Sequence, residues 1–242
     1  MDALIMAAGR GSRLGGETDI RPKGLVDIGG ISPLEFQIDI LADRSVSRAT
    51  VVTGYRREMV EEAVRQRAAG RMELTFVWNP FWPVTNVLGS AWMARESLAD
   101  DVVYLHADTV FTPSILDDCL AAGGGAALPI DLRPCELEQM KATVVDGRVT
   151  HLSKELPDER TAGEFIGIGV FRSSSLAGLR AAMDDELEAG GLTSYFEAAI
   201  NRAVKDAGLE VVAVPTRGRP WTEIDFPEDL ELARRILPEL RA

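Results

Sequence analysis

Short apolar runs alternate with longer amphipathic segments along most of the chain. An apolar run of a few residues bounded by turn residues predicts a buried strand, whereas apolar positions three and four residues apart predict one face of a helix. Regular alternation of the two is typical of α/β proteins, in which helices cover a sheet. The pattern therefore predicts an α/β fold with a mostly parallel, mixed central sheet.

The first half of the chain carries a well-marked helix start. Ser32 can cap the first turn, Pro33 suits the first helical position, and Glu35 stands three residues after the serine, as in a capping box. Pro80 and Pro83 interrupt both strand and helix, so a loop is expected around them. In this half we predict strands over 3–8, 49–53, 74–78 and 102–106, a short apolar run over 25–28, and helices over 56–69, over 87–98 and from 112.

The second half combines a hairpin with further strands and helices. Asp146-Gly147 lies between two short apolar segments, and this pair favours the tight primed turn of a β-hairpin. Gly208 is expected to end a helix. No linker or repeat is visible, so we expect one domain over 1–242. In this half we predict strands over 126–129, 143–145, 148–152, 165–171 and 210–214, and helices over 175–187, 194–207 and 227–236.

Composition and charge exclude several classes of protein. The formal net charge is −12, which disfavours general nucleic-acid binding. No apolar run approaches the roughly 20 residues of a membrane helix, and the N-terminal run lacks the basic flank of a secretion signal. Cys119 and Cys135 have no metal-like spacing and are expected to be reduced thiols in a cytoplasmic protein. His106 and His151 are the only histidines, which excludes a His-rich metal site, and we interpret His106 as structural.

A basic, glycine-rich loop follows the first predicted strand. It runs from Gly9 to Leu14, and Lys23 follows after a turn-rich stretch. Glycines let backbone N–H groups approach an anion, and Arg13 and Lys23 add positive charge, so the loop predicts a cradle for a polyphosphate. A dinucleotide-binding fingerprint is disfavoured because 15–22 is expected to leave no room for the helix it requires, and the sequence lacks a P-loop. An ordinary strand-to-loop turn is the alternative.

Three carboxylates stand where a ligand site is expected. Asp108 follows the predicted strand over 102–106, and in open parallel sheets ligands bind at that end of the strands. Glu223 and Asp225 flank Ile224, so both point to one side of an extended segment and repel each other unless a cation lies between them. Mg²⁺ favours such oxygen ligands. Asp108 and Asp225 could instead cap the helices that follow them.

Several motifs occur in the order that one enzyme family shows. Together they resemble the nucleotidyltransferases that activate sugars and phospho-alcohols, and most closely the branch of CTP:phosphocholine and phosphonate cytidylyltransferases. The resemblance implies a Rossmann-like three-layer sandwich of the nucleotide-diphospho-sugar transferase type, with a nucleotide-binding part over about 1–122 and an acceptor-binding part over about 123–242. The motifs are Ala7–Lys23, Thr85-Asn86-x-x-x-Ser90, Leu105-His106-Ala107-Asp108, Ser153-Lys154-Glu155, Gly163-Glu164-Phe165-Ile166-Gly167 and Trp221-Thr222-Glu223-Ile224-Asp225.

The resemblance and the chemistry of the side chains together suggest a role for each candidate residue. The catalytic residues are Lys23, Arg13 and Lys154, of which Lys154 contacts the acceptor's phosphate. The nucleotide-binding residues are Ala7, Ala8, Gly9, Arg10, Gly11, Ser12, Asn86, Ser90 and Ala107. The acceptor-binding residues are Lys154, Lys141, Trp82, Glu164 and Trp221, and the ligands of a Mg²⁺ ion are Asp108, Asp225 and Glu223.

Some of these residues have a plainer interpretation. Asn86 could equally cap a helix, and Lys154 could be an ordinary surface lysine. Aromatic faces attract quaternary ammonium groups, which makes the tryptophans candidate contacts for a choline-like acceptor. Of these, Trp78 and Trp92 fit core positions, whereas Trp82 and Trp221 are expected in loops beside the candidate site.

The resemblance implies a Mg²⁺-dependent enzyme that transfers CMP from CTP to a small phosphorylated or phosphonate acceptor and releases pyrophosphate. Neither nucleic acid nor membrane is expected as a partner, and a homodimer stays open. The alternatives are a sugar-1-phosphate nucleotidyltransferase that uses UTP or dTTP, and a non-catalytic nucleotide-sensing protein on the same fold. The stretch 15–21 departs from the P-L-T-type segment of the sugar enzymes, which puts sugar specificity in doubt.

Overall fold

The computed structural model of the protein describes residues 1–241, and they divide into two compact units. Unit 1 contains Met1–Pro83, Val103–Pro113 and the C-terminal segment from Pro220. Unit 2 contains Val84–Val102 and Ser114–Arg219. The unit boundaries differ from the expected division near residue 122, because Val84–Val102 lies in unit 2 and the segment from Pro220 lies in unit 1. The expectation of one domain over 1–242 stays a prediction.

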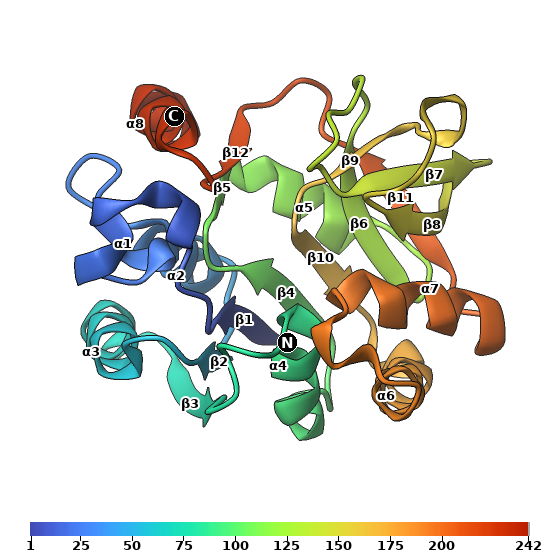
Figure 1. The fold of residues 1–242 in the computed structure, drawn as a ribbon, viewed down its shortest axis with the longest axis horizontal. Helices are drawn as coiled ribbons and strands as arrows, with labels where there is room; N and C mark the ends of the chain where they lie inside the picture. Colours follow the sequence, from blue (N-terminus) through green and yellow to red (C-terminus); the bar gives the residue numbers. More distant parts are fainter. Residues whose placement is uncertain (242) are drawn as a thin grey trace. The chain divides into compact units, whose positions relative to one another are not determined.

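Unit 1 is built on parallel strands joined by helices. Its strand order is β4-β1-β2-β3, and both the β1–β2 and the β2–β3 pairs are parallel, with Met6 opposite Val52 and Val52 opposite Val77. Parallel neighbours need a crossover connection, which α2 and α3 provide (Figure 1). The predicted strands and helices are confirmed here. Their bounds are β1 Asp2–Ala7, α2 Pro33–Asp43, β2 Arg48–Thr53, α3 Arg57–Ala68, β3 Glu73–Trp78 and β4 Val102–His106.

The capping box that the sequence predicts at the start of α2 is present. The Ser32 hydroxyl accepts a hydrogen bond from the Glu35 backbone N–H (3.3 Å), and the Glu35 carboxylate accepts one from the Ser32 N–H (2.9 Å). Pro33 occupies the first turn, where its missing N–H costs nothing. The C-terminal helix α8, Pro227–Leu240, also starts on a proline and confirms the helix predicted there.

A short antiparallel ribbon in unit 1 was not predicted. β5, Thr109–Phe111, pairs with β12, Trp221–Glu223, and Glu223 lies opposite Thr109. The Ile224 N–H continues the contact by donating to the Asp108 carbonyl (3.1 Å). Helix α8 packs beside both strands (Figure 1). This ribbon brings the segments that carry Asp108 and Asp225 together.

The N-terminal loop differs from the expectation that it leaves no room for a helix. The stretch after the glycines does hold a helix, the five-residue α1, Gly16–Ile20, which follows a 3-10 turn over Ser12–Leu14. The apolar run over 25–28 forms no strand, because Lys23–Leu25 is another 3-10 turn and the Asp27 carboxylate accepts hydrogen bonds from two later backbone N–H groups. These bonds hold the pKa of Asp27 below its usual value.

Unit 2 contains a mixed set of strands in the order β11-β8-β7-β9-β6-β10. The predicted hairpin is confirmed, and Asp146 and Gly147 both have the positive φ of a primed turn (49° and 75°). The strand predicted over 165–171 is divided at Gly167, where φ is 75°. The bounds in unit 2 are β6 Ala126–Asp131, β7 Lys141–Val145, β8 Arg148–Ser153, β9 Gly163–Phe165, β10 Ile168–Phe171 and β11 Val211–Pro215.

The helices of unit 2 agree with the sequence except after residue 93. There, α4 ends and a 3-10 turn over Arg95–Ser97 replaces the longer helix that we predicted. Helices α6 and α7 pack against each other, and Gly208 follows α7 in a left-handed conformation (φ 66°). The bounds are α4 Val87–Met93, α5 Pro113–Ala121, α6 Ser173–Glu188 and α7 Phe196–Asp206.

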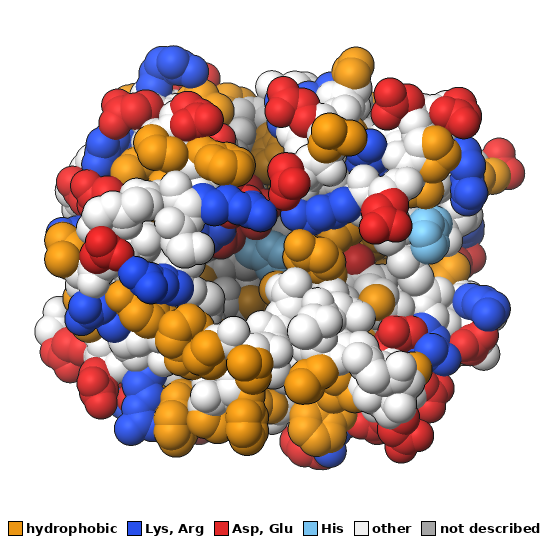
Figure 2. Space-filling model, in the orientation of Figure 1, with side chains coloured by type: hydrophobic (Ala, Val, Ile, Leu, Met, Phe, Trp, Pro, Cys, Tyr) orange, Lys and Arg blue, Asp and Glu red, His pale blue; other side chains and the backbone are white. Residues whose placement is uncertain are grey.

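The expectation that two tryptophans lie in the core was wrong. Trp78, on the edge strand β3, is 49% exposed and lies under the Arg57 guanidinium. Trp92 is half-buried, and its indole N–H donates to Asp184 (2.6 Å). Figure 2 shows hydrophobic side chains gathered over β3 and the loop that follows it. Among residues 1–241, no helix has both the length and the apolar character needed to cross a membrane.

Candidate active site

The glycine loop follows β1 and turns back toward Lys23. Gly11 has a φ of +76°, and a Cβ atom added there would lie 2.6 Å from Lys23 Cβ. Only glycine therefore allows the lysine stem to pass the loop at this distance. The Thr18 hydroxyl fixes the turn by donating to the Gly11 carbonyl (2.9 Å). Ala7 and Ala8 are buried, whereas Gly9, Arg10 and Ser12 are exposed on the same loop.

Lys23 joins two of the three predicted metal ligands. Its Nζ atom lies 2.5 Å from Asp108 Oδ2 and forms an ion pair with Asp225 Oδ1, although only 13% of the side chain is exposed. Burial alone would lower the pKa of Lys23, but attraction by Asp108, Glu223 and Asp225 outweighs burial and raises it. The ammonium is therefore charged at neutral pH, and its contribution to stability is lost only as the pH rises through this raised pKa.

Asp108 is held in a tight turn after β4. The Ala107 N–H donates to the Met6 carbonyl (3.2 Å), and the Gln37 amide donates to the carbonyls of His106 (2.6 Å) and Thr109 (2.7 Å). The carboxylate does not cap the next helix. Burial raises its pKa, Lys23 opposes that rise, and its Oδ1 atom is buried without a hydrogen-bond partner among the described residues.

Glu223 and His106 complete the group. His106 Nδ1 lies 3.5 Å from Glu223 Oε1, and His106 Nε2 lies 3.0 Å from the Tyr104 hydroxyl. One ligand atom from each of His106, Asp108 and Glu223 falls within 4.8 Å of the others. We call Lys23, His106, Asp108, Glu223 and Asp225 the Lys23 cluster.

Arg13 stands at the edge of the Lys23 cluster. Its guanidinium lies 3.4 Å from Asp225 Oδ2 and 5.5 Å from the centre of the Phe226 ring. The side chain is 47% exposed, so this ion pair is weak and the cation can turn toward a ligand. Phe226, and not Asp225, is the N-cap residue of α8, and the Asp225 N–H donates to the Asp229 carboxylate (3.0 Å).

The predicted nucleotide-binding residues Asn86 and Ser90 lie in unit 2. The Asn86 side chain accepts a hydrogen bond from the Val87 N–H (2.8 Å), which is the helix-capping alternative. Ser90 is buried one turn later on α4. A role for either residue in binding a base stays a prediction.

Two of the predicted acceptor residues, Lys141 and Glu164, are buried cross-strand partners in unit 2. Lys141 Nζ donates to the Leu156 carbonyl (3.1 Å), and the Glu164 carboxylate accepts from Arg133 (3.0 Å). These contacts favour a structural role for both residues. Their contact with an acceptor stays a prediction.

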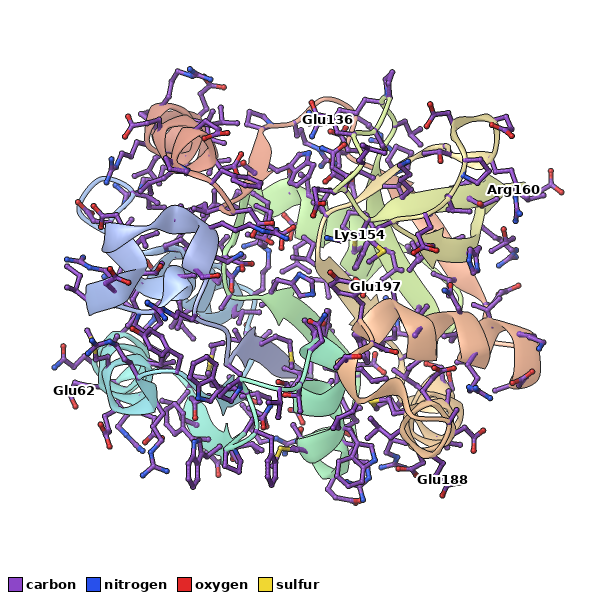
Figure 3. The ribbon with its side chains drawn as sticks, viewed as in Figure 1. Glu62, Glu136, Lys154, Arg160, Glu188 and Glu197 are labelled. Atoms are coloured by element: carbon purple, nitrogen blue, oxygen red, sulfur yellow. The ribbon has the colours of Figure 1, made fainter. Side chains whose placement is uncertain are left out.

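Lys154 has a different environment. Its Nζ atom lies over the Tyr195 ring (4.9 Å) and 3.9 Å from Glu138, and a quarter of the side chain is exposed. Tyr195 directly precedes α7, and the buried Glu197 lies in the first turn of that helix. Figure 3 labels Lys154 and Glu197. A partly exposed ammonium on an aromatic face is better suited than Lys141 to meet a ligand.

The tryptophans expected near the site are separate from one another. Trp82 packs edge-to-face on Tyr55, with ring centres 5.3 Å apart. Trp221 is half-buried in β12 opposite Phe111. An aromatic cage is therefore not formed by these two side chains alone.

Comparison with known proteins places this arrangement in a family. The model of the MobA-like NTP transferase domain matches residues 3–132, which include the glycine loop, Lys23 and Asp108. The chain belongs to the family of MobA-like NTP transferase domains. The resemblance read from the motifs is confirmed, since similar proteins include cytidylyltransferases.

Two curated relatives match this NTP transferase domain over nearly its whole length. The CMP-5'-(3-aminopropyl)phosphonate synthase of Streptomyces rubellomurinus is 32% identical over 94% of this chain and 37% of the relative. The bifunctional IPC transferase and DIPP synthase of Rubrobacter xylanophilus is 31% identical over 97% of this chain and 51% of the relative. The chain thus spans between about a third and about a half of the length of these relatives.

A solved structure supports the fold. The CTP:phosphocholine cytidylyltransferase of Streptococcus pneumoniae superimposes with a TM-score of 0.79 at 21% identity, over 98% of both chains. The α/β, Rossmann-like fold class with a mixed, mostly parallel sheet is confirmed by this match.

Sequence reasoning missed part of the site of this NTP transferase domain. Gln37 is fully buried and clamps the turn around Asp108. A glutamine between apolar neighbours in a helix was the only signal. His106 joins the metal-binding candidates, and its place at the end of β4, two residues before Asp108, was the available hint.

Proposed function

We propose that the chain is a cytidylyltransferase that uses Mg²⁺ to transfer CMP from CTP to a small phosphonate or phosphomonoester, with release of pyrophosphate. The Lys23 cluster beside the glycine loop is the observation that carries this proposal. It places a buried, protonated ammonium next to backbone N–H groups suited to a polyphosphate. The name of the Streptomyces relative, which joins CMP to an aminopropyl phosphonate, supports the choice of base and acceptor.

The carboxylates of the cluster are suited to a divalent cation. Asp108 Oδ1 is buried without a partner among residues 1–241, and Asp108 and Glu223 offer atoms close enough to share one ion. Mg²⁺ favours such oxygen ligands and keeps sites for phosphate oxygens. Asp108 and Glu223 would hold the ion, and Asp225 would join them once Lys23 turns to a phosphate. When bound, the ion would supply positive charge to the phosphates.

The transfer needs little more than position and charge. An oxygen of the acceptor's phosphate or phosphonate forms a bond to the α-phosphorus while the bond to the bridging oxygen breaks, and pyrophosphate leaves with that electron pair. The acceptor is already an anion near neutral pH, so no strong general base is required. Lys23 and Arg13 neutralise the charge that gathers on the phosphates, and the loop N–H groups orient them.

The remaining roles follow the motifs. Lys154 contacts the charged group of the acceptor, and Asn86 and Ser90 contribute to the nucleotide pocket. A pocket that recognises cytosine places a hydrogen-bond acceptor opposite its 4-amino group. The same protein atom would face the 4-oxo group of uracil without a hydrogen bond, at a cost of about 1–3 kcal/mol. CTP should then exceed UTP about ten- to a hundredfold in kcat/KM.

A panel assay tests the proposal against its rivals. CTP, UTP, ATP and GTP are each combined with phosphocholine, 3-aminopropylphosphonate, phosphonoformate and glucose 1-phosphate, and pyrophosphate and products are measured. We expect CMP esters of a phosphonate or phosphomonoester. A UTP product on glucose 1-phosphate would instead identify a sugar-1-phosphate enzyme, and nucleotide binding without pyrophosphate would identify a sensor.

A further inference from the structure

His106 presents one ring nitrogen to the carboxylates of the Lys23 cluster. Its Nε2 atom lies 3.0 Å from the hydroxyl of Tyr104, which is buried at 1% exposure. The hydroxyl oxygen can accept a hydrogen bond from Nε2–H in one of the two neutral tautomers of the ring. The tautomer that makes this bond leaves the Nδ1 lone pair facing Glu223 Oε1, 3.5 Å away.

In this tautomer, one metal ion bound by both Nδ1 and Oε1 would remove the repulsion between their lone pairs. Ligand atoms about 2.1 Å from one metal ion lie about 3–4 Å apart, and the Nδ1–Oε1 separation of 3.5 Å falls in this range. Asp108 supplies the third atom within 4.8 Å of the other two. Its Oδ2 atom is paired with Lys23, but its buried Oδ1 atom has no hydrogen-bond partner among the described residues.

The backbone around these three side chains is rigid. Gln37 bonds the carbonyls on both sides of the Ala107–Asp108 turn, and the Ile224 N–H bonds the Asp108 carbonyl. The ribbon between β5 and β12 fixes Glu223 opposite Thr109. The donor atoms are therefore in place before any nucleotide binds.

We infer that His106 Nδ1, Asp108 and Glu223 form a mixed nitrogen–oxygen metal site that binds Co²⁺ and similar transition ions more tightly than Mg²⁺. Imidazole nitrogen adds affinity for ions later in the first transition row, whereas Mg²⁺ gains little from it. Tyr104 is the positioning residue, because its hydroxyl fixes the tautomer and the ring. The inference rests on the same cluster as the proposed function and concerns which cation the cluster holds.

Cobalt binding to the nucleotide-free protein tests the inference. Titration with Co²⁺, followed by its visible absorption and by calorimetry, should show one site at least about tenfold tighter than the Mg²⁺ site. In the ¹H NMR spectrum of the Co²⁺ protein, one strongly shifted imidazole N–H should appear and exchange in D₂O. This signal is the direct signature of histidine ligation and needs no variant.

Variants show which histidine gives the shifted N–H signal. His106→Gln should weaken Co²⁺ binding about tenfold or more, change Mg²⁺ binding less than about threefold and remove the shifted N–H. His151→Gln, which changes the other histidine of the chain, on β8, should leave all three unchanged. Tyr104→Phe should lower Co²⁺ affinity several-fold while the protein keeps its melting temperature within a few degrees.

The inference is overturned if the wild-type protein shows no shifted N–H, or if His106→Gln binds Co²⁺ as the wild type does. His106 would then be a structural or protonated partner of Glu223. Because no nucleotide is present, these results do not depend on the proposed reaction. If the protein ligates Co²⁺ through histidine but transfers no CMP from CTP, the proposed function alone is rejected. If it transfers CMP but does not ligate Co²⁺ through histidine, this inference alone is rejected.

Discussion

Buried charges are used differently in the two units. In unit 1, Lys23, Asp108 and Asp225 contact one another across 202 residues of sequence, and one oxygen of Asp108 is left over. In unit 2, the buried Lys141 bonds a backbone carbonyl and the buried Glu164 bonds an arginine of the same unit. The charges in unit 1 are available for a ligand, whereas those in unit 2 are paired with groups of the protein itself.

The contrast separates two lysines that were both predicted to bind the acceptor. Lys141 is buried and donates to the Leu156 carbonyl, whereas Lys154 keeps a quarter of its side chain exposed. A buried charge that is fully satisfied by the protein gains nothing from a substrate.

Asp108→Asn should have the largest effect and abolish turnover. The amide keeps the shape of the carboxylate but removes the charge that a cation and Lys23 require. Because burial raises the pKa of Asp108, its charged form is costly in the fold, so we expect the melting temperature to change by less than about 4 °C. Pyrophosphate release and a circular dichroism melt measure the two properties. An active variant would remove Asp108 from the metal assignment.

Lys23→Ala should lower turnover by about two to three orders of magnitude, the scale for one lost electrostatic stabiliser. The change also leaves Asp108 and Asp225 facing each other without a cation, so the melting temperature should fall and added Mg²⁺ should restore part of it. Arg13→Ala is the control for the melting temperature alone, since the half-exposed ion pair of Arg13 with Asp225 contributes little stability. A Lys23→Ala enzyme with wild-type turnover would contradict the role of the cluster.

Gly11→Ala should lower turnover about ten- to a hundredfold by displacing Lys23, because a shift of about 1 Å at a reacting group costs that much. The new Cβ would lie 2.6 Å from Lys23 atoms, at a φ of +76°. Gly16→Ala is the matched control, because a Cβ there meets nothing within 4 Å. Equal turnover of the two variants would show that the loop does not position Lys23.

Lys141→Met and Lys154→Ala should have the smallest and most divergent effects. Losing the Lys141 ammonium leaves the Leu156 carbonyl unpaired and costs about 1–3 kcal/mol of unfolding free energy, with no change in the KM of the acceptor. Lys154→Ala should raise that KM and leave stability unchanged. Steady-state kinetics and urea unfolding separate the two. A raised acceptor KM in Lys141→Met would restore Lys141 to the acceptor site.

Local features of the fold were predictable from the sequence. The capping box at Ser32 and the primed turn at Asp146-Gly147 depend on neighbours within a few residues, and both formed as expected. The β5–β12 ribbon could not be predicted, because it pairs segments more than a hundred residues apart. The division at Gly167 was missed because the apolar pattern continues through it, although the backbone turns there.

The candidate site was predictable as a set of residues but not as a set of contacts. The motifs named Lys23, Asp108 and Asp225, yet no pattern in one sequence says that the lysine lies between the two carboxylates. His106 was interpreted as structural because a lone histidine in an apolar strand usually is. The contact of His106 with Glu223 depends on the β5–β12 ribbon, which pairs segments far apart in the sequence.

Pyrophosphate release from CTP is the most direct test of the central claim that the Lys23 cluster catalyses nucleotidyl transfer. The rate is measured with an aminoalkyl phosphonate or phosphocholine as acceptor while Mg²⁺ is titrated against EDTA. The account predicts that release requires the acceptor, rises with free Mg²⁺ and stops in excess EDTA. Full turnover in EDTA, or CTP binding without any release, would contradict it.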